Sequence, residues 1–331
     1  MTANSHPTLP LLVSMGDACG IGPEIIAALW RREAPGDAVV VGDVAIMRRA
    51  VQAVGGGLAV AELAGPEELA QVPPRCLPVW QPPGLPAGLL EAPLGRVDAR
   101  AGAAAARCIE AAVALIQAGR ARGLVTAPIH KEALHAAGSP YPGHTEMLQA
   151  LAGDAPVRMM LANEELRTVL VTIHCALREA IERVTRERVR ETLRITDAAL
   201  RRMGLAAPRI AVAGLNPHAG EGGLFGREEI EHIAPAIADA RAAGVDASGP
   251  YAPDTVFMRA RRGEFDVVVA MTHDHGLIPV KYLGVEQGVN VTLGLPFVRT
   301  SPDHGTAFDI AGKGVADPSS LMAALKMARR L

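Results

Sequence analysis

The sequence predicts an α/β fold with largely parallel sheets. Short apolar runs alternate with amphipathic, helix-like segments from one end of the chain to the other, which is the pattern of strand–helix–strand units. The apolar runs are continuous rather than alternating, as expected for parallel strands that are buried on both faces. The chain has 331 residues, and this length suggests about two domains.

Each expected strand is a short aliphatic run that ends at a glycine, a proline or a polar residue. Leu11–Met15 precedes a glycine-rich turn, and Val267–Thr272 runs directly into the sequence His-Asp-His-Gly. The other expected strands are Ala38–Val41, Leu58–Leu63, Gly123–Ala127, the runs that lead to His174 and His218, and Val289–Leu293. In open α/β sheets, ligands bind beyond the carboxyl ends of the strands, so chemistry is expected there.

The expected helices are marked by capping residues and by helical periodicity. Pro23 suits the first helical position, since the amide hydrogen that proline lacks would have no partner there. Gly119 suits the position just after a helix end. The predicted helices are Ile25–Arg32, the segment from Asp43 to about Val54, Ala101–Ala118, a helix beginning near Glu146, Arg178–Met203 and Glu228–Ala243. The stretch Pro66–Gly95 is rich in proline and glycine, and we expect it to be irregular.

The composition excludes several classes of protein. The net charge is −2 and there is no basic block, which argues against nucleic acid as a partner. No apolar run reaches the roughly 18–20 residues that cross a bilayer, and residues 1–10 lack the pattern of a secretory signal. We therefore expect a soluble, cytoplasmic protein. The 4 cysteines are scattered and suggest no disulfide framework, and we interpret Cys175 as a small buried residue.

Three histidines follow three separate expected strands. They are His174, His218 and His273, and glycine-rich or polar turns surround them. If the strands are parallel, their carboxyl ends meet at one edge of the sheet, and three neutral imidazoles there could bind zinc, cobalt, nickel or iron. The alternative is that the three histidines are unrelated surface or core residues, and the spacing alone leaves both interpretations open.

Two further segments have the features of anion sites. The turn Gly16–Glu24 feeds a helix N-terminus, although its glycine spacing is neither that of a Rossmann fingerprint nor that of a P-loop. The alternative is a tight strand-to-helix turn. His144 and Thr145 lie at the start of another expected helix, where polar donors meet anions, unless Thr145 is only an N-cap.

The C-terminal segment shows a family resemblance. From Asp303 to Pro318 the chain reads Asp-His-Gly-Thr-Ala-Phe-Asp-Ile-Ala-Gly-Lys-Gly-Val-Ala-Asp-Pro. This stretch resembles the cofactor loop of the metal-dependent β-decarboxylating dehydrogenases, the isocitrate and isopropylmalate dehydrogenase superfamily. The resemblance implies that NAD, with NADP as the alternative, is bound by His304, Gly305, Thr306, Ala307, Asp309 and Asp317.

The same resemblance implies two α/β/α lobes with an active-site cleft between them. The cofactor lobe is expected to be discontinuous, formed by residues 1–130 plus about 295–331. The lobe for metal, substrate and dimerisation is expected at about 131–294.

A closer resemblance covers the chain from about Leu11 to Leu325. The blocks Tyr-Pro-Gly-His-Thr-Glu, Leu-Asn-Pro-His-Ala-Gly-Glu-Gly-Gly, Ala-Pro-Asp-Thr and Gly-Val-Asn-Val-Thr-Leu-Gly-Leu-Pro-Phe-Val-Arg-Thr-Ser resemble those of the 4-hydroxythreonine-4-phosphate dehydrogenase family. The resemblance implies a homodimer with shared active sites. One divalent ion (zinc, cobalt, manganese or magnesium) would be held by His174, His218 and His273. The implied substrate contacts are His144, Thr145, Lys281, Asn290 and Arg299.

The implied reaction is the NAD-dependent oxidation and decarboxylation of 4-phosphooxy-L-threonine to 3-amino-2-oxopropyl phosphate, a step of pyridoxal phosphate biosynthesis. Lys281, Asp254 and Asp274 are the predicted catalytic residues, and the two aspartates either orient a ligand histidine or relay a proton. A metal-dependent hydrolase or a phosphate-binding regulatory protein is the alternative of another class. A hydrolase would have no use for the adenosine-binding loop that the resemblance implies.

The chain departs from the family pattern at two places, and the second of them, Thr272 and His275 beside a metal ligand, could change which substrate fits. Ala18-Cys19 replaces Pro-Ala in the first turn, and Thr272 and His275 replace the usual Tyr and Gln around His273. His275 is either a fourth metal ligand or a neighbour of the ligands. One branch of the family oxidises D-threonate or D-erythronate 4-phosphate in catabolism, and it stays as the alternative function. Asn290 and Arg299 argue against the branch that oxidises aromatic dihydrodiols, which lacks these phosphate-reading residues.

Overall fold

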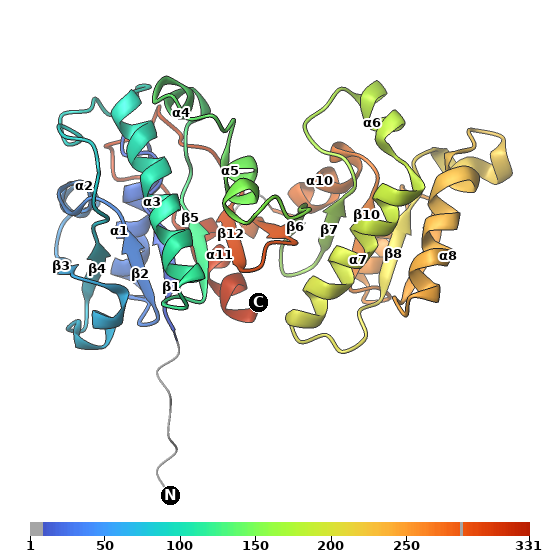
Figure 1. Cartoon of the computed structure of the whole chain (residues 1–331), viewed down its shortest axis with the longest axis horizontal. Coiled ribbons are helices and arrows are strands. Elements are labelled where there is room, and N and C mark those ends of the chain that lie inside the picture. Colours follow the sequence, from blue (N-terminus) through green and yellow to red (C-terminus); the bar gives the residue numbers. More distant parts are fainter. Residues whose placement is uncertain (1–8, 285–286) are drawn as a thin grey trace, which may run out of the picture. The chain divides into compact units, whose positions relative to one another are not determined.

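The computed structural model describes residues 9–284 and 287–331 of the chain. The chain forms two compact α/β units (Figure 1). The first unit comprises Met1–Ala155 and Leu295–Ala328, and the second comprises Pro156–Gly294 and Arg329–Leu331. The first unit is therefore discontinuous in the sequence.

Residues 131–155 belong to the first unit, whereas the sequence-based boundary after residue 130 assigned them to the second. They include α4 (Lys131–Ala136), which packs closely on α3 (Ala99–Gln117). A Cβ atom at Gly102 would lie 2.0 Å from the carbonyl oxygen of Ala133. This close packing of the two helices is what fixes the segment to the first unit.

All strand pairs within the first unit are parallel among the described residues, in the order β3-β4-β2-β1-β5-β12. The strands are β1 (Leu11–Ser14), β2 (Ala38–Val41), β3 (Ala59–Leu63), β4 (Cys76–Trp80), β5 (Gly123–Thr126) and β12 (Val298–Pro302). β1, β2 and β5 are buried at every residue, which explains why they read as continuous aliphatic runs. The predicted parallel α/β class is confirmed.

Two helices of the first unit, α2 and α3, begin at aspartates that cap them. The Asp43 carboxylate accepts a hydrogen bond from the amide of Ile46 (2.8 Å) at the start of α2, and Asp98 does the same for Arg100 (2.8 Å) at the start of α3. The bounds are α1 (Gly22–Arg32), α2 (Val44–Ala53), η1 (Pro66–Gln71), α5 (His144–Leu151) and α11 (Ser319–Arg330).

The second unit has a mixed sheet in the order β11-β6-β7-β10-β8-β9. β11 (Val289–Leu293), β6 (Arg158–Ala162) and β7 (Arg167–Leu170) pair antiparallel, whereas β7, β10 (Val267–Ala270), β8 (Ile210–Ala213) and β9 (Ala247–Tyr251) pair parallel. The helical elements are α6 (Leu177–Arg183), α7 (Arg186–Arg202), η2 (Pro217–Gly223), η3 (Glu229–Ile233), α8 (Ala234–Ala242), α9 (Val256–Arg261) and α10 (His273–Tyr282). In the part of the chain that is described, no helix combines the length and the apolar character needed to cross a membrane.

The core of the second unit is aliphatic, as the aromatic content of 3% requires. β10 lies at its centre and is fully buried. Leu161, Leu170, Val268 and Leu277 pack together there, with a single phenylalanine, Phe257, among the buried residues of this cluster. The core thus surrounds the two parallel strands whose carboxyl ends carry His174 and His273.

Two predicted elements were wrong in ways that the structure explains. The expected helix Arg178–Met203 is two helices, α6 and α7, because the hydroxyl of Thr185 accepts a hydrogen bond from the amide of Arg188 (3.3 Å) and starts a new helix there. The stretch Pro66–Gly95 is not irregular throughout, since it contains β4 between β2 and β3. Burial of Leu77 and Val79 outweighs the single missing amide hydrogen of Pro78.

Other boundaries also shifted. Arg299 lies within β12 and Gly249 and Pro250 lie within β9, two strands that the sequence did not predict. β6 follows no strong sequence signal and was not expected. The segment Glu228–Ala243 begins with the π-helical turn η3 before α8 starts. Each of these elements is set by pairing or packing with distant residues.

Candidate active site

Two of the three strand-end histidines lie side by side. His174 follows β7 and His273 is the first residue of α10, directly after β10, and their ring centroids are 5.8 Å apart. The parallel pairing of the two strands continues up to this point. The amide and the hydroxyl of Thr172 both donate to the carbonyl oxygen of Met271, at 3.2 and 2.8 Å. Two imidazoles this close can bind one metal ion.

Carboxylates hold the Nδ1 atoms of two of the histidines. Nδ1 of His273 is 2.7 Å from Oδ1 of Asp274, and Nδ1 of His218 is 3.0 Å from Oε2 of Glu221. A carboxylate beside Nδ1 favours the proton on that nitrogen and leaves Nε2 as the ligand atom, which is the usual arrangement of metal-binding histidines.

The backbone is strained at two of the histidines. His174 has a φ of 34° and His218 a φ of 53°, both in the left-handed region that residues with a Cβ rarely adopt. Ala219 and Glu221 beside His218 share this conformation, with φ of 53° and 43°. Such strain persists only where the surrounding structure enforces it, and it often marks functional segments.

Two adjoining pockets surround these residues. One, of about 480 Å³, is lined by His218, Asp254, Asp274 and His275 together with apolar residues of α9, of α10 and of the segment that follows β8. The other, of about 640 Å³, contains His174, His273 and Cys175. Asp274 and His275 line both pockets. Cys175 is only half-buried, so it is not the fully buried residue that the sequence suggested.

The predicted three-histidine ligand set is only partly assembled in the described residues. There, no group of three or more His, Cys, Asp or Glu side chains is close enough to hold a metal ion. His174 and His273 form a pair, whereas His218 lies in the neighbouring pocket. The chemistry of the donors fits a divalent ion, and the three-ligand set stays a prediction.

His275 stands between the two pockets. Its Nδ1 atom is buried and has no hydrogen-bond partner among residues 9–284 and 287–331. Burial lowers the pKa of His275, although the nearby Asp274 acts in the opposite direction. A neutral imidazole with an unused nitrogen can contact a ligand in either pocket.

The remaining predicted residues of the second unit are more dispersed. Asp254 is exposed at the rim of the smaller pocket, and Asp274 contacts His273 directly. Lys281 lies in the last turn of α10 and Asn290 in β11, and both are half-buried. Neither is among the residues that line the two pockets.

Of the predicted anion-binding residues of the first unit, Arg299 is buried, whereas His144 and Thr145 are half-buried. Arg299 is 3% exposed and its Nη2 donates to the hydroxyl of Thr126 at 2.8 Å. Burial lowers the pKa of Arg299 to about 10, so it keeps its charge at neutral pH. His144 and Thr145 begin α5, as predicted. Burial and the nearby Arg299 charge lower the pKa of His144 well below its usual value, so His144 is neutral.

The segment that resembles a cofactor loop is attached to the N-terminal part of the first unit. The carbonyl oxygen of Thr306 accepts a hydrogen bond from the amide of Ile21 (3.0 Å), and a Cβ on Gly20 would clash with Thr306. The Glu24 carboxylate accepts hydrogen bonds from the amides of Gly312 and Gly314. The glycine-rich turn at residues 16–24 therefore holds the loop in place.

The other predicted cofactor residues have their own local roles. Nδ1 of His304 lies 3.0 Å from the carbonyl oxygen of Gly305, and Ala307 has a φ of 42°. Asp309 is exposed. Asp317 forms an ion pair with Arg32 (3.1 Å). The structure thus places all six predicted residues on one anchored segment, and their contact with a cofactor stays a prediction.

Sequence reasoning missed two contributors to this region, Asp17 and His130. The Asp17 carboxylate is 1% exposed and accepts a hydrogen bond from the amide of Cys19 (2.8 Å). Burial raises the pKa of Asp17 to about 6, although the backbone and side chain of His130 partly oppose this. The His130 ring stacks on Phe308 of the loop, with centroids 4.6 Å apart. In the sequence, only the pair Gly16-Asp17 after the first strand indicated that Asp17 contributes to this region.

The chain matches a known family over most of its length. Residues 35–328 match the model of the family described as the pyridoxal phosphate biosynthetic protein PdxA. A 4-hydroxythreonine-4-phosphate dehydrogenase of Beijerinckia indica subsp. indica is 56% identical over 323 residues, which cover 97% of this chain and 95% of that protein.

Two further comparisons agree in extent. A D-threonate 4-phosphate dehydrogenase of Cupriavidus necator is 48% identical, over 98% of this chain and 97% of that protein. The crystal structure of a 4-hydroxythreonine-4-phosphate dehydrogenase from Klebsiella pneumoniae is 44% identical with a TM-score of 0.88. That match covers 97% of this chain and 100% of the other.

Proposed function

Because the chain belongs to the PdxA family, a family of dehydrogenases, we propose that it oxidises and decarboxylates 4-phosphooxy-L-threonine with NAD, giving 3-amino-2-oxopropyl phosphate for pyridoxal phosphate biosynthesis. The observation that carries the proposal is the pair of imidazoles, His174 and His273, at the carboxyl ends of two parallel strands. Ligands bind at this position in α/β sheets, and a metal-dependent dehydrogenase needs such donors there.

The second unit supplies the metal ligands in this proposal. His174, His218 and His273 would hold one zinc, cobalt, manganese or magnesium ion, which as a Lewis acid favours ionisation of a bound hydroxyl. Asp274 keeps the proton of His273 on Nδ1 (2.7 Å), and Glu221 does the same for His218 (3.0 Å). The direct contact of Asp274 with His273 supports a role for Asp274 in orienting that ligand. Asp254 is exposed and is the better candidate for moving a proton to solvent.

The anion of the substrate would be bound by residues with fixed charge states. Arg299 is buried and charged, and its planar guanidinium suits phosphate. His144 is neutral, so it offers a hydrogen bond without adding a charge. Lys281 and Asn290 would complete the set, together with Thr145. Asn290 and Arg299 support a phosphorylated substrate over an aromatic dihydrodiol.

The segment from His304 to Asp317 would hold the adenosine part of the cofactor, with NAD preferred and NADP as the alternative. NAD accepts the hydride, and that chemistry belongs to the cofactor. The protein's part is to keep the segment in one conformation. The bonds from Ile21 to Thr306 and from Gly314 to Glu24, at 3.0 and 2.8 Å, support this role.

A second candidate substrate is a sugar-acid phosphate, D-threonate or D-erythronate 4-phosphate. The 48% identical relative named D-threonate 4-phosphate dehydrogenase favours it. The two candidates differ at one carbon, where the amino acid carries an amine and the sugar acid a hydroxyl. His275 lines both pockets and Thr272 lines the larger, which supports a role for these two residues in distinguishing the amine from the hydroxyl.

We also propose a homodimer with shared active sites. Leu177 lines the pocket with His174 and is 66% exposed, and Ile278 lines the pocket with His218 and is 62% exposed. Phe225 and Tyr282 of the same unit are exposed as well. Exposed apolar side chains around polar pockets are typical of an interaction surface. Mixing inactive Arg299→Gln and His273→Ala subunits would restore part of the activity if the sites are shared, and none if they are not.

The test of the function is NADH formation by metal-loaded protein offered the amino acid phosphate and the two sugar-acid phosphates in parallel. Turnover of 4-phosphooxy-L-threonine that a chelator abolishes and added metal restores is the expected result. A preference for a sugar-acid phosphate would favour the second candidate. NADH formation that persists after the chelator has removed all metal would refute the metal site.

A further inference from the structure

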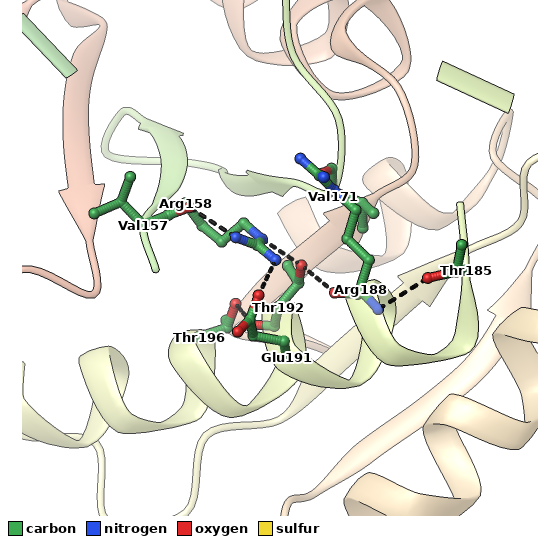
Figure 2. A network of polar contacts seen from close by, with 8 residues as sticks. All are labelled: Val157, Arg158, Val171, Thr185, Arg188, Glu191, Thr192 and Thr196. Atoms are coloured by element: carbon green, nitrogen blue, oxygen red, sulfur yellow. Dashed lines mark hydrogen bonds and ion pairs between the residues drawn. The ribbon is translucent and has the colours of Figure 1, made fainter. Parts of the chain in front are cut away.

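The end of strand β7 is held from outside the sheet by an arginine of helix α7. Nε of Arg188 donates to the carbonyl oxygen of Val171 at 2.8 Å, as Figure 2 shows. The amide of Val171 in turn donates to the carbonyl oxygen of Ala270 at 2.9 Å. The peptide groups on both sides of Val171 are therefore fixed, three residues before His174.

Arg188 is itself fixed by its helix and by a second strand. Its amide donates to the hydroxyl of Thr185 (3.3 Å), and its carbonyl oxygen accepts a hydrogen bond from the hydroxyl of Thr192 (2.8 Å). The same hydroxyl accepts from Nε of Arg158 (2.7 Å), which reaches over from β6 and pairs with Glu191 (2.7 Å). In Figure 2 these contacts form one continuous chain that ends at Val171.

The position of Arg188 is unfavourable for a cation. Within residues 9–284 and 287–331, no carboxylate forms an ion pair with it, whereas Arg186 and Arg201 of the same helix are paired with aspartates. Burial, followed by the charges of Arg158 and Arg183, lowers the pKa of Arg188. A half-buried charge beside like charges costs stability, so the benefit of this arginine must lie elsewhere.

The benefit is found at His174. Its φ of 34° is strained, and a strained residue keeps its conformation only where neighbouring contacts enforce it. The hydrogen bond from Arg188 to Val171 is one such restraint, and the two hydrogen bonds from Thr172 to Met271 are the others. Together they hold the first two residues of the segment 171–174. Without the first restraint, the segment 171–174 can relax and the His174 ring can leave His273.

We propose that Arg188 is a positioning residue that holds His174 beside His273 and thereby sets the affinity of the site for a divalent ion. This inference rests on the proposed metal site. Helix α7 lines neither pocket, so in this proposal Arg188 influences metal binding indirectly, through the backbone carbonyl of Val171.

The test compares three variants of the full-length protein. Arg188→Gln removes the charge and the guanidinium, Arg188→Lys keeps a charged donor but loses the planar fork, and Arg194→Gln makes the matched change at an exposed arginine of the same helix. The affinity for Zn²⁺ and Co²⁺ is measured by competition with a chromogenic chelator, and the Co²⁺ absorption spectrum reports the ligand geometry.

We expect Arg188→Gln to weaken metal affinity by roughly 10-fold or more, the usual size of effects from residues that support metal ligands. The metal affinity of Arg188→Lys should lie between those of the wild type and Arg188→Gln. The metal affinity of Arg194→Gln should equal that of the wild type. The thermal midpoint of the metal-free Arg188→Gln protein should not fall, because the removed charge is unfavourable. A merely structural arginine would instead lower this midpoint and leave the metal affinity of the folded protein unchanged.

Equal metal affinity of wild type and Arg188→Gln would overturn the inference and leave the metal site standing. Wild-type protein that binds no divalent ion, or binds it equally well after His174→Ala, would overturn the proposed metal site and this inference with it. If Arg188→Gln does not fold, the comparison of Arg188→Lys with Arg194→Lys decides in the same way.

Discussion

The buried carboxylate of Asp17 provides the sharpest test of the electrostatics. Its pKa rises from an ordinary value of 3.8 to about 6 in the folded protein, chiefly through burial. The folded state therefore binds the proton more tightly than the unfolded state, so ionised Asp17 opposes folding. The penalty is absent below pH 3.8 and fully present above about pH 6. A shift of about 2 units at 1.36 kcal/mol per unit gives a penalty of about 3 kcal/mol.

Asp17→Asn removes this penalty and keeps an oxygen that can accept the hydrogen bond from the amide of Cys19. We expect the variant to be more stable than the wild type by up to about 3 kcal/mol at about pH 8, and by about half of that at about pH 5. Urea unfolding at the two pH values measures both differences.

Asp98→Asn is the matched control with the opposite sign. Hydrogen bonds from Arg100 lower the pKa of Asp98, so its charge stabilises the fold fully above its ordinary pKa of 3.8, and the stability lost in Asp98→Asn should be the same at about pH 5 and about pH 8. A destabilised Asp17→Asn protein, with the same deficit at both pH values, would refute the argument about Asp17.

Three further predictions concern the site and its supports. Asp274→Asn should weaken Zn²⁺ binding roughly 10-fold in a chelator competition, because it leaves Nδ1 of His273 without its carboxylate, and should leave NAD binding unchanged. Phe308→Ala removes the ring stack on His130, worth about 1 kcal/mol, and should raise the KM for NAD about fivefold while metal content stays constant. Thr185→Ala removes the cap of α7 and should lower stability by about 1 kcal/mol in urea unfolding, whereas Thr185→Ser should not.

The parts of the fold that followed from the sequence are those governed by local chemistry. A continuous aliphatic run such as Val267–Ala270 can be read directly, because a strand buried on both faces has no polar side to alternate with. The residue after such a run falls at the ligand-binding edge of a parallel sheet. That is why His174 and His273 could be named in advance and why the structure brings them together.

The parts that did not follow depend on contacts between distant residues. β4 was hidden by Pro78 and by the prolines that flank the strand, and only its place between β2 and β3 explains it. Arg186, Arg190 and Arg194 of α7 recur every four residues and are exposed. Arg188 lies four residues before the buried Thr192 and so on another face of the helix, but nothing in the local sequence identifies the Val171 carbonyl as its partner.

The pocket region of the second unit and the loop attachment of the first share a physical property. His174 and His218 hold a strained backbone, Arg188 holds an unpaired charge among the described residues, and Asp17 holds an ionised carboxylate at 1% exposure. None of these features stabilises the fold, and each is kept in place by hydrogen bonds from neighbouring residues. Local rules are broken most often where function requires it. Variants that relieve such a cost, as Asp17→Asn does, should therefore be more stable than the wild type.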